Sequence, residues 1–306
     1  MKRTNDILLT HIPHGKNPEI FKPVDKNNPE LQKLKSSLMS QDYEFVVLFN
    51  SRNIRRKQIP DTILAFRMFT DMLSEEQAKK CLLLLHTQPI DEHGTDLPKV
   101  IEYYSTDYTN IKFTNGVLSD EGMNYLYNLA DVTILLTDNE GWGLSITESL
   151  LCGVPFIGNV TGGIQDQMRF EDEKGNWINF SKDFPSNHRG TYKKCGEWAF
   201  PVFPNNQSIK GSVPTPYITA DSVQPEHAAK TIFEAFSLGR EELKRRGLKG
   251  REWALSEESG FTSKVMAERV INSIDKVLET WKPREEFELL DTKLVKKHSI
   301  GEKLTY

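Results

Sequence analysis

Two glutamates and a glycine-flanked loop lie close together in the middle of the chain. The loop, residues 140–143, follows an apolar run that ends at Thr137, and a helical pattern begins at Leu144. Glycines let a backbone approach a ligand closely, and a helix N-terminus offers unpaired N–H groups and a positive dipole end. Glu148 lies about one turn into this helix, where a carboxylate suits the vicinal hydroxyls of a ribose. The arrangement favours a site for a diphosphate and a ribose, flanked by Glu140 and Glu148.

Each of these features also has an ordinary structural interpretation. A Gly-x-Gly loop is often only a turn, and a glutamate on a helix is usually a solvated surface residue. The strand–loop–helix context, the apolar segment 150–158 and a second turn at residues 161–163 support the binding site together.

Alternating strands and helices must position this loop. We predict a doubly wound parallel sheet, in which ligands bind beyond the carboxyl ends of the strands. The predicted strands are nearly continuous apolar runs at residues 44–50, 81–87, 110–114, 131–137 and 154–158. The predicted helices between them cover residues 59–73, 119–129 and 144–151.

The alternation ends at residue 170. Residues 170–217 are rich in Asn, Gly, Pro and aromatic residues, which predicts an ordered but irregular insertion or lid. Helical patterns return at residues 225–238, 240–255 and 261–281, and the last carries an apolar stripe. We therefore expect three parts in the chain. They are a linker-like segment at 1–43, a Rossmann-like domain at 44–282 and a charged tail at 283–306.

The overall composition excludes several classes of protein. The net charge of −4, from 39 basic and 43 acidic residues, indicates no general affinity for nucleic acid. No apolar segment is long enough for a signal peptide or a membrane span, and three cysteines without metal-ligand spacing fit a reduced, cytoplasmic setting. The scattered histidines predict no metal site, and the chain has no Asp-x-Asp triplet, no Gly-x-Ser-x-Gly elbow and no phosphate-binding loop of nucleotide triphosphatases.

The central segment resembles the signature of the retaining glycosyltransferase family 4, whose GT-B fold pairs two Rossmann-like domains. That family's pattern is Glu-Gly-Phe-Gly-Leu, then Glu-Ala, Gly-x-Pro-Val and a Gly-Gly turn. The matching residues here are Glu140-Gly141-Trp142-Gly143-Leu144, Glu148-Ser149, Gly153-Val154-Pro155-Phe156 and Gly162-Gly163. The resemblance implies that Glu140 contacts the donor sugar and Glu148 the ribose of the nucleotide. It also implies that amides around Gly143 and Leu144 hold the distal phosphate.

Three further segments resemble the same family. Its Gly-Arg pair and following lysine, which contact the diphosphate, correspond to Ser51-Arg52 and Lys57. Arg55 and Arg56 lie in the same loop, so which cation serves stays open. Residues 115–121 resemble the loop that receives the nucleobase, and residues 12–15 resemble the linker before the donor domain.

The resemblance implies metal-independent transfer of a sugar, with retention of configuration, from a nucleoside diphosphate sugar to an unidentified acceptor. The nucleotide sugar is the substrate, and no cofactor is expected. The expected catalytic residues are Glu140, Arg52 and Lys57, and the expected donor-binding residues are Glu148, Gly141, Trp142, Gly143, Leu144, Val117 and Gly163. Trp142 stands where the family has Phe, and it either packs or shapes the sugar pocket.

The linker-like segment starts close to residue 1, so we expect the family's N-terminal acceptor domain to be absent from this chain. The acceptor surface would then come from a partner chain or a homo-oligomer, from the insertion at 170–217, or from sequence outside this chain. The alternative is a non-catalytic module, or a donor-binding subunit, that binds nucleotide sugars.

Overall fold

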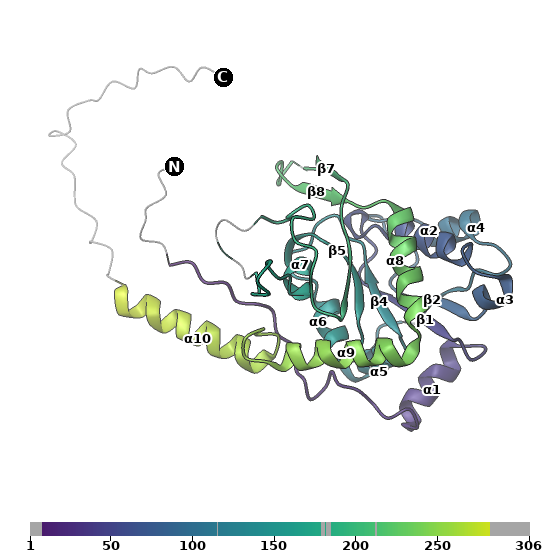
Figure 1. Cartoon of the computed structure of the whole chain (residues 1–306), viewed down its shortest axis with the longest axis horizontal. Helices are drawn as coiled ribbons and strands as arrows, with labels where there is room; N and C mark the ends of the chain where they lie inside the picture. The colour runs from purple at the N-terminus through teal and green to yellow at the C-terminus, as the bar shows by residue number, and fades with distance from the viewer. Residues whose placement is uncertain (1–7, 115, 179–180, 182–184, 212, 282–306) are drawn as a thin grey trace, which may run out of the picture.

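Six parallel strands form the central sheet in the computed structural model of the chain, which describes residues 8–114, 116–178, 181, 185–211 and 213–281 (Figure 1). The strand order is β3-β2-β1-β4-β5-β6. From the centre of the sheet, β1 to β3 follow one another toward one edge and β4 to β6 toward the other edge. This order confirms the doubly wound sheet. The strands are β1 (Phe45–Asn50), β2 (Cys81–His86), β3 (Ile111–Phe113), β4 (Val132–Leu135), β5 (Phe156–Asn159) and β6 (Ala199–Val202).

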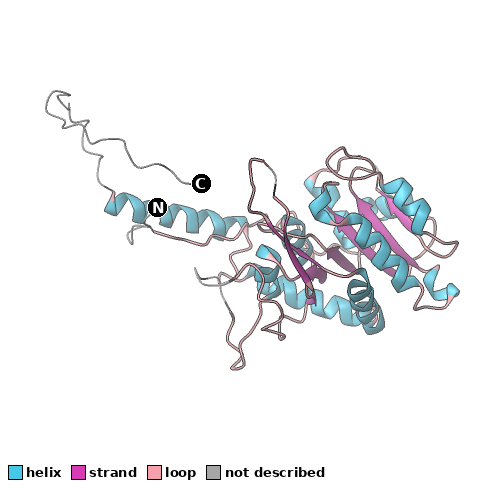
Figure 2. Cartoon of the chain, turned by 90° about the horizontal axis from the view of Figure 1, so that it is seen from above, coloured by secondary structure: helices cyan, strands magenta, loops and turns pink. Residues whose placement is uncertain are grey.

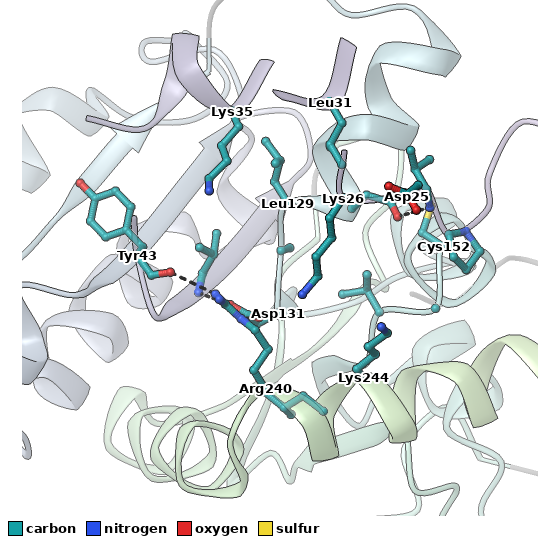
Figure 3. A pocket seen from close by; sticks show the side chains of 18 of the residues that line it. Asp25, Lys26, Leu31, Lys35, Tyr43, Leu129, Asp131, Cys152, Arg240 and Lys244 are labelled. Atoms are coloured by element: carbon teal, nitrogen blue, oxygen red, sulfur yellow. Dashed lines mark hydrogen bonds and ion pairs between the residues drawn. The ribbon is translucent and has the colours of Figure 1, made fainter. Parts of the chain in front are cut away.

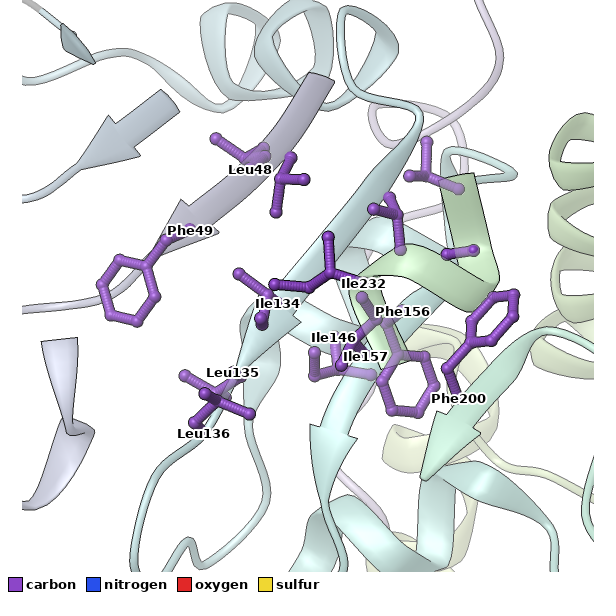
Figure 4. Packing of buried hydrophobic residues seen from close by; sticks show 14 of the residues in the cluster. Leu48, Phe49, Ile134, Leu135, Leu136, Ile146, Phe156, Ile157, Phe200 and Ile232 are labelled. Atoms are coloured by element: carbon purple, nitrogen blue, oxygen red, sulfur yellow. The ribbon is translucent and has the colours of Figure 1, made fainter. Parts of the chain in front are cut away.

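The central strands are apolar because helices cover both faces of the sheet (Figure 2). On β1 and β4, Leu48 and Ile134 are buried, and Phe156 and Ile157 on β5 continue the same core (Figure 4). A charged side chain at any of these positions would lie in a low-dielectric interior without a partner. The core therefore holds the strand ends, and the loops after them, in fixed positions.

The helices pack in two groups. In the first group, α2 (Ile59–Thr70) packs against α4 (Leu97–Tyr104) and α8 (Pro225–Leu238). In the second group, α6 (Leu144–Leu151) packs against α5 (Asp120–Asn128), α7 (Gly162–Met168) and α9 (Arg240–Leu255). The remaining elements are α1 (Pro29–Leu38), η1 (Arg55–Lys57), α3 (Glu75–Ala78), β7 (Asn206–Ile209), β8 (Thr219–Ser222) and α10 (Ser263–Thr280). No helix of the described chain is long and apolar enough to cross a membrane.

Two expected segments differ from the structure. The segment 1–43 is expected as a linker, but it contains α1, which the side chain of Asn28 caps by accepting from the N–H groups of Glu30 and Leu31. The segment 170–217 is expected to be irregular, but β6 lies within it and pairs in parallel with β5. This part belongs to the sheet. The predicted tail at 283–306 lies outside the described residues.

The N-terminal segment and the start of α10 are joined side by side. The N–H of Lys16 donates to the carbonyl of Phe261 at 3.0 Å, and the N–H of Ser263 donates to the carbonyl of Lys16 at 2.9 Å. From there α10 extends away from the sheet (Figure 1). The predicted apolar stripe of this helix is exposed, with Ile271 at 57% and Leu278 at 63% exposure, and no residue of α10 is buried.

Candidate functional site

A cavity of about 370 Å³ lies at the carboxyl ends of β1 and β4. This is the end of a doubly wound sheet where ligands bind. The cavity brings together six of the predicted site residues: Lys57, Glu140, Trp142, Gly143, Leu144 and Glu148. It is also lined by His14, Asn50, Ser51 and Ser145, which the sequence did not single out as donor ligands.

The N-terminus of α6 opens into this cavity. Gly143 caps the helix with a φ of 87°, in the left-handed region that favours glycine, and no side chain caps the helix. The first amides of α6 are therefore available to an anion, and the helix dipole favours negative charge there.

Close backbone contact holds the loop before α6 in place. The N–H of Gly163 donates to the carbonyl of Glu140 at 3.1 Å. A Cβ atom on Gly163 would lie 2.5 Å from the carbonyl oxygen of Gly141. Only glycine fits at position 163. The Gly162–Gly163 turn packs against the backbone of residues 140–142 and does not line the cavity.

Two cations hold the carboxylate of Glu140. The ammonium of Lys57 donates to Oε2 of Glu140, and Nη1 of Arg56 contacts the same oxygen at 3.1 Å. Arg56 also donates to the carbonyl of Asn139 at 2.8 Å. Lys57 is only 7% exposed, and this burial lowers the pKa of its ammonium despite the opposing effect of Glu140. Lys57 and Glu140 line the cavity, and Arg56, whose side chain is 39% exposed, contacts Glu140 from outside the lining.

Arg52 lies apart from this cluster. Its side chain is 60% exposed and forms an ion pair with Asp91, with 3.0 Å between Nε and Oδ2. The structure therefore brings Arg56, and not Arg52, to Glu140. Arg52, Arg56 and Lys57 lie in one loop of the sequence. The turn η1 directs the side chains of Arg56 and Lys57 toward Glu140.

Glu148 is held inside the cavity by two other side chains. The ammonium of Lys16 lies 2.8 Å from Oε1, and the hydroxyl of Tyr127 donates to Oε2 at 2.8 Å. Burial, followed by the charge of Glu148, raises the pKa of Tyr127 well above its usual value, which keeps its hydroxyl proton in place. Asn50 in turn donates to the hydroxyl oxygen of Tyr127 at 2.8 Å. Lys16 and Tyr127 were missed from the sequence.

Trp142 is fixed by a closed chain of hydrogen bonds. Its indole Nε1 donates to Thr147 at 2.9 Å, Thr147 donates to Oε1 of Gln167 at 2.8 Å, and Gln167 donates back to the carbonyl of Trp142 at 2.6 Å. The ring also packs edge-on against Phe261, with 5.2 Å between the ring centroids. Trp142 therefore both packs and forms a rigid wall of the cavity.

Three other predicted residues lie outside the lining of the cavity. Gly141 and Gly163 belong to the supporting backbone contact described above. Val117 is 98% exposed on the loop before α5. Residue 115, which begins the predicted nucleobase loop, lies outside the described residues.

Another cavity, about 950 Å³, lies at the opposite end of the sheet between α1 and α9 (Figure 3). Four of its charged side chains form two pairs within the lining. Arg240 binds Asp131 through two hydrogen bonds, and Lys35 lies 2.6 Å from Asp42. None of the predicted site residues lines this cavity.

Comparison with known proteins identifies the segment that carries the site. The family profile described as "Glycosyl transferases group 1" matches residues 32–183. The chain is 25% identical over 154 residues to the serotype-specific mannosyltransferase WbdA of Escherichia coli, covering 50% of this chain and 18% of WbdA. It is 25% identical over 181 residues to the trehalose synthase of Pyrococcus horikoshii, covering 53% of this chain and 43% of that enzyme. The chain thus spans less than half the length of these relatives.

The fold is shared with solved glycosyltransferase structures. The structure of Anabaena HepE in complex with UDP and glucose matches with a TM-score of 0.58 at 15% identity, covering 87% of this chain and 56% of HepE. At this identity the likeness shows a shared fold. The profile match shows that this chain belongs to the group 1 glycosyl transferases, the family 4 that its motifs resemble.

Proposed function

We propose that the chain binds a nucleoside diphosphate sugar in the cavity at α6 and transfers the sugar, with retention of configuration, to an acceptor. The observation that carries this proposal is the buried carboxylate of Glu140, held by Lys57 and Arg56 beside the uncapped N-terminus of α6. An anion bound there would meet two cations and several free amides.

Each part of the donor has a proposed partner. The diphosphate is bound by Lys57, Arg56 and the first amides of α6, and the sugar hydroxyls by Glu140. The structure favours Arg56 over Arg52 because Arg52 pairs with Asp91. Glu148 accepts the ribose hydroxyls, since its two oxygens have lone pairs beyond those used by Lys16 and Tyr127.

The proposed reaction breaks the bond between the sugar and the diphosphate through an oxocarbenium-like transition state. Negative charge develops on the leaving diphosphate, and preorganised cations and amides stabilise it. The acceptor oxygen forms the new bond to the anomeric carbon on the face from which the diphosphate leaves, and the leaving phosphate takes the acceptor proton. The anomeric carbon therefore keeps its configuration. Lys57 and Arg56 need no reorganisation for this role, because Glu140 already orients them.

A donor-binding subunit that needs a partner is the second candidate. The apolar face of α10 supports it, since Ile271, Ile274 and Leu278 are exposed on one protruding helix. The three cysteines are unpaired, which supports the proposed cytoplasmic setting.

The test of donor binding is a thermal shift experiment with UDP, GDP and ADP in the presence of EDTA. At a ligand concentration of 100 times the dissociation constant, a bound nucleotide should add about 2.7 kcal/mol to the free energy of unfolding. No shift with any of the three nucleotides would refute the donor site. NMR analysis of the product anomer then tests the reaction, and an inverted product would refute the retaining mechanism.

A further inference from the structure

A second cavity, about 220 Å³, shares Trp142 with the proposed donor site. Its aromatic walls are Trp142, Trp177 and Phe261. These walls are rigid, because Trp142 packs edge-on against Phe261 and Trp177 packs edge-on against Trp253 with 4.8 Å between centroids. The volume is below the roughly 300–1,000 Å³ of sites for drug-sized ligands, so it fits one small ring.

Asp166 on α7 lines this cavity. Its carboxyl forms no hydrogen bond or ion pair with any residue of the described chain. Burial raises the pKa of Asp166 to about 7. A carboxyl that is desolvated and unpaired beside aromatic rings is costly to keep, and a ligand that donates hydrogen bonds to it would offset this cost.

The other charges around the cavity select the ligand. Arg269 also lines it and is anchored by donating to the carbonyls of Glu257 at 2.5 Å and Glu258 at 3.0 Å. Burial, and then the charge of Arg269, lowers the pKa of His11, so this ring is neutral at pH 7. The guanidinium disfavours a cationic ligand, and Asp166 with the exposed Glu258 disfavours an anionic one. A neutral ligand rich in hydroxyls suits this set.

We propose that this cavity binds a single neutral sugar ring of the acceptor. The apolar C–H face of the ring packs on Trp142 or Trp177, its hydroxyls donate to Asp166, and Arg269 donates to a ring hydroxyl oxygen. Because Trp142 is a wall of both cavities, a ring bound here lies next to the bound donor. The assignment rests on the proposed function in naming the ring as the acceptor, but binding of a sugar here can be measured without any reaction.

The test uses protein with ¹⁵N-labelled tryptophan, saturated with UDP so that the donor site is filled. Methyl α-glucoside, methyl α-mannoside and methyl α-N-acetylglucosaminide are each added, and the indole signals are followed. At least one glycoside should shift the signals of Trp142 and Trp177. The signal of Trp198, whose indole donates to the carbonyl of Gln167 at 3.1 Å, should stay unchanged.

Two variants assign the binding to this cavity. Asp166→Leu should weaken glycoside binding at least about tenfold, since a hydrogen bond to a carboxylate contributes about 1.5–3 kcal/mol, and Asp166→Asn should weaken it less. The matched control Glu173→Gln changes an exposed carboxylate and should leave the affinity unchanged. Unaltered UDP binding shows that each variant is folded.

The outcomes separate this inference from the proposed function. If UDP binds but none of the three glycosides shifts Trp177, or if Asp166→Leu binds the glycoside as well as the parent protein, the sugar site is refuted. If UDP does not bind, the donor site is refuted, and the glycoside titration without UDP still tests the cavity.

Discussion

Replacing Glu140 by glutamine should destabilise the protein more than replacing Lys57 by methionine, although both changes break the same ion pair. In Glu140→Gln the buried ammonium of Lys57 loses its carboxylate, and losing one partner of a buried pair costs roughly 3–5 kcal/mol. The lowered pKa of Lys57 limits this cost, because the amine can release its proton, so we expect about 3 kcal/mol. In Lys57→Met, Arg56 still contacts Glu140 at 3.1 Å. The cost is then that of one charged hydrogen bond, about 1.5–3 kcal/mol.

The double variant should be little worse than Lys57→Met alone. Once Lys57 is methionine, exchanging Glu140 for glutamine no longer leaves a buried ammonium without a partner. We therefore expect a coupling energy close to the cost of Glu140→Gln alone, about 3 kcal/mol, at the upper end of the range for residues in direct contact. The expected coupling is large because Lys57 is buried. The double-mutant cycle therefore tests whether Glu140 compensates a buried ammonium.

Urea unfolding, followed by tryptophan fluorescence and circular dichroism, gives the free energy of unfolding of the parent protein, the two single variants and the double variant. The comparison requires that the dependence of this free energy on urea concentration is the same for all four proteins. The exposed pair of Lys80 and Glu44, 2.9 Å apart, is the matched control, and its coupling should stay below about 1 kcal/mol. Additive effects of Lys57→Met and Glu140→Gln would refute the reasoning. So would a larger cost for the lysine variant than for the glutamate variant.

Three other predictions concern the two cavities. Calorimetry with UDP should show at least about tenfold weaker binding in Arg56→Ala and a smaller loss in Arg52→Ala, because a charged hydrogen bond contributes about 1.5–3 kcal/mol; the reverse order would favour Arg52 as the diphosphate ligand. Gly163→Ala should lower both the melting temperature and UDP affinity, because its Cβ would lie 2.5 Å from a backbone oxygen, whereas Gly141→Ala, with no atom within 4 Å of a new Cβ, should fold normally. The pKa of Asp166, about 7 in the folded state, exceeds its usual value of about 3.9, so the folded state binds more protons between these values and stability falls as pH rises through this window. Asp166→Asn should therefore raise the melting temperature relative to the parent protein more at pH 8 than at pH 5, and calorimetry at both values checks this.

The sequence predicted the elements whose signals are local. Continuous apolar runs predicted β1 and β2, and the boundaries of α6, α8 and α9 agree with the structure. It did not predict β6, because this strand contains Pro201 and lies in a segment rich in Asn, Gly and Pro. A proline cannot donate to a sheet ladder, and it is tolerated here because β6 is an edge strand. Asn28 followed by Pro29 is a local signal for the start of α1.

The site divides in the same way. Glu140, Lys57 and Glu148 come from short segments with recognisable spacing, and the structure brings them to one cavity. The partners of Glu148 could not be predicted, since Lys16 reaches it from a segment 132 positions earlier, 148 minus 16. Arg56 and Arg52 are both arginines in the loop between β1 and α2, so residue type alone does not separate them. Only their side-chain directions separate them, and those depend on the turn η1 and on Asp91.

The joining of Lys16 to Phe261 and Ser263 has a consequence for the order of events during synthesis. Phe261, whose carbonyl accepts from the N–H of Lys16, is synthesised 245 residues after Lys16. At roughly 5–20 residues per second this interval is on the order of ten to fifty seconds. During this interval the nascent chain can form β1 to β5. The backbone of Lys16 still lacks its partners Phe261 and Ser263, so nothing fixes its ammonium at Glu148. A ribosome-bound chain that stalls before Phe261 would thus carry a folded sheet with an incomplete site, and the site is completed once the start of α10 has left the ribosome.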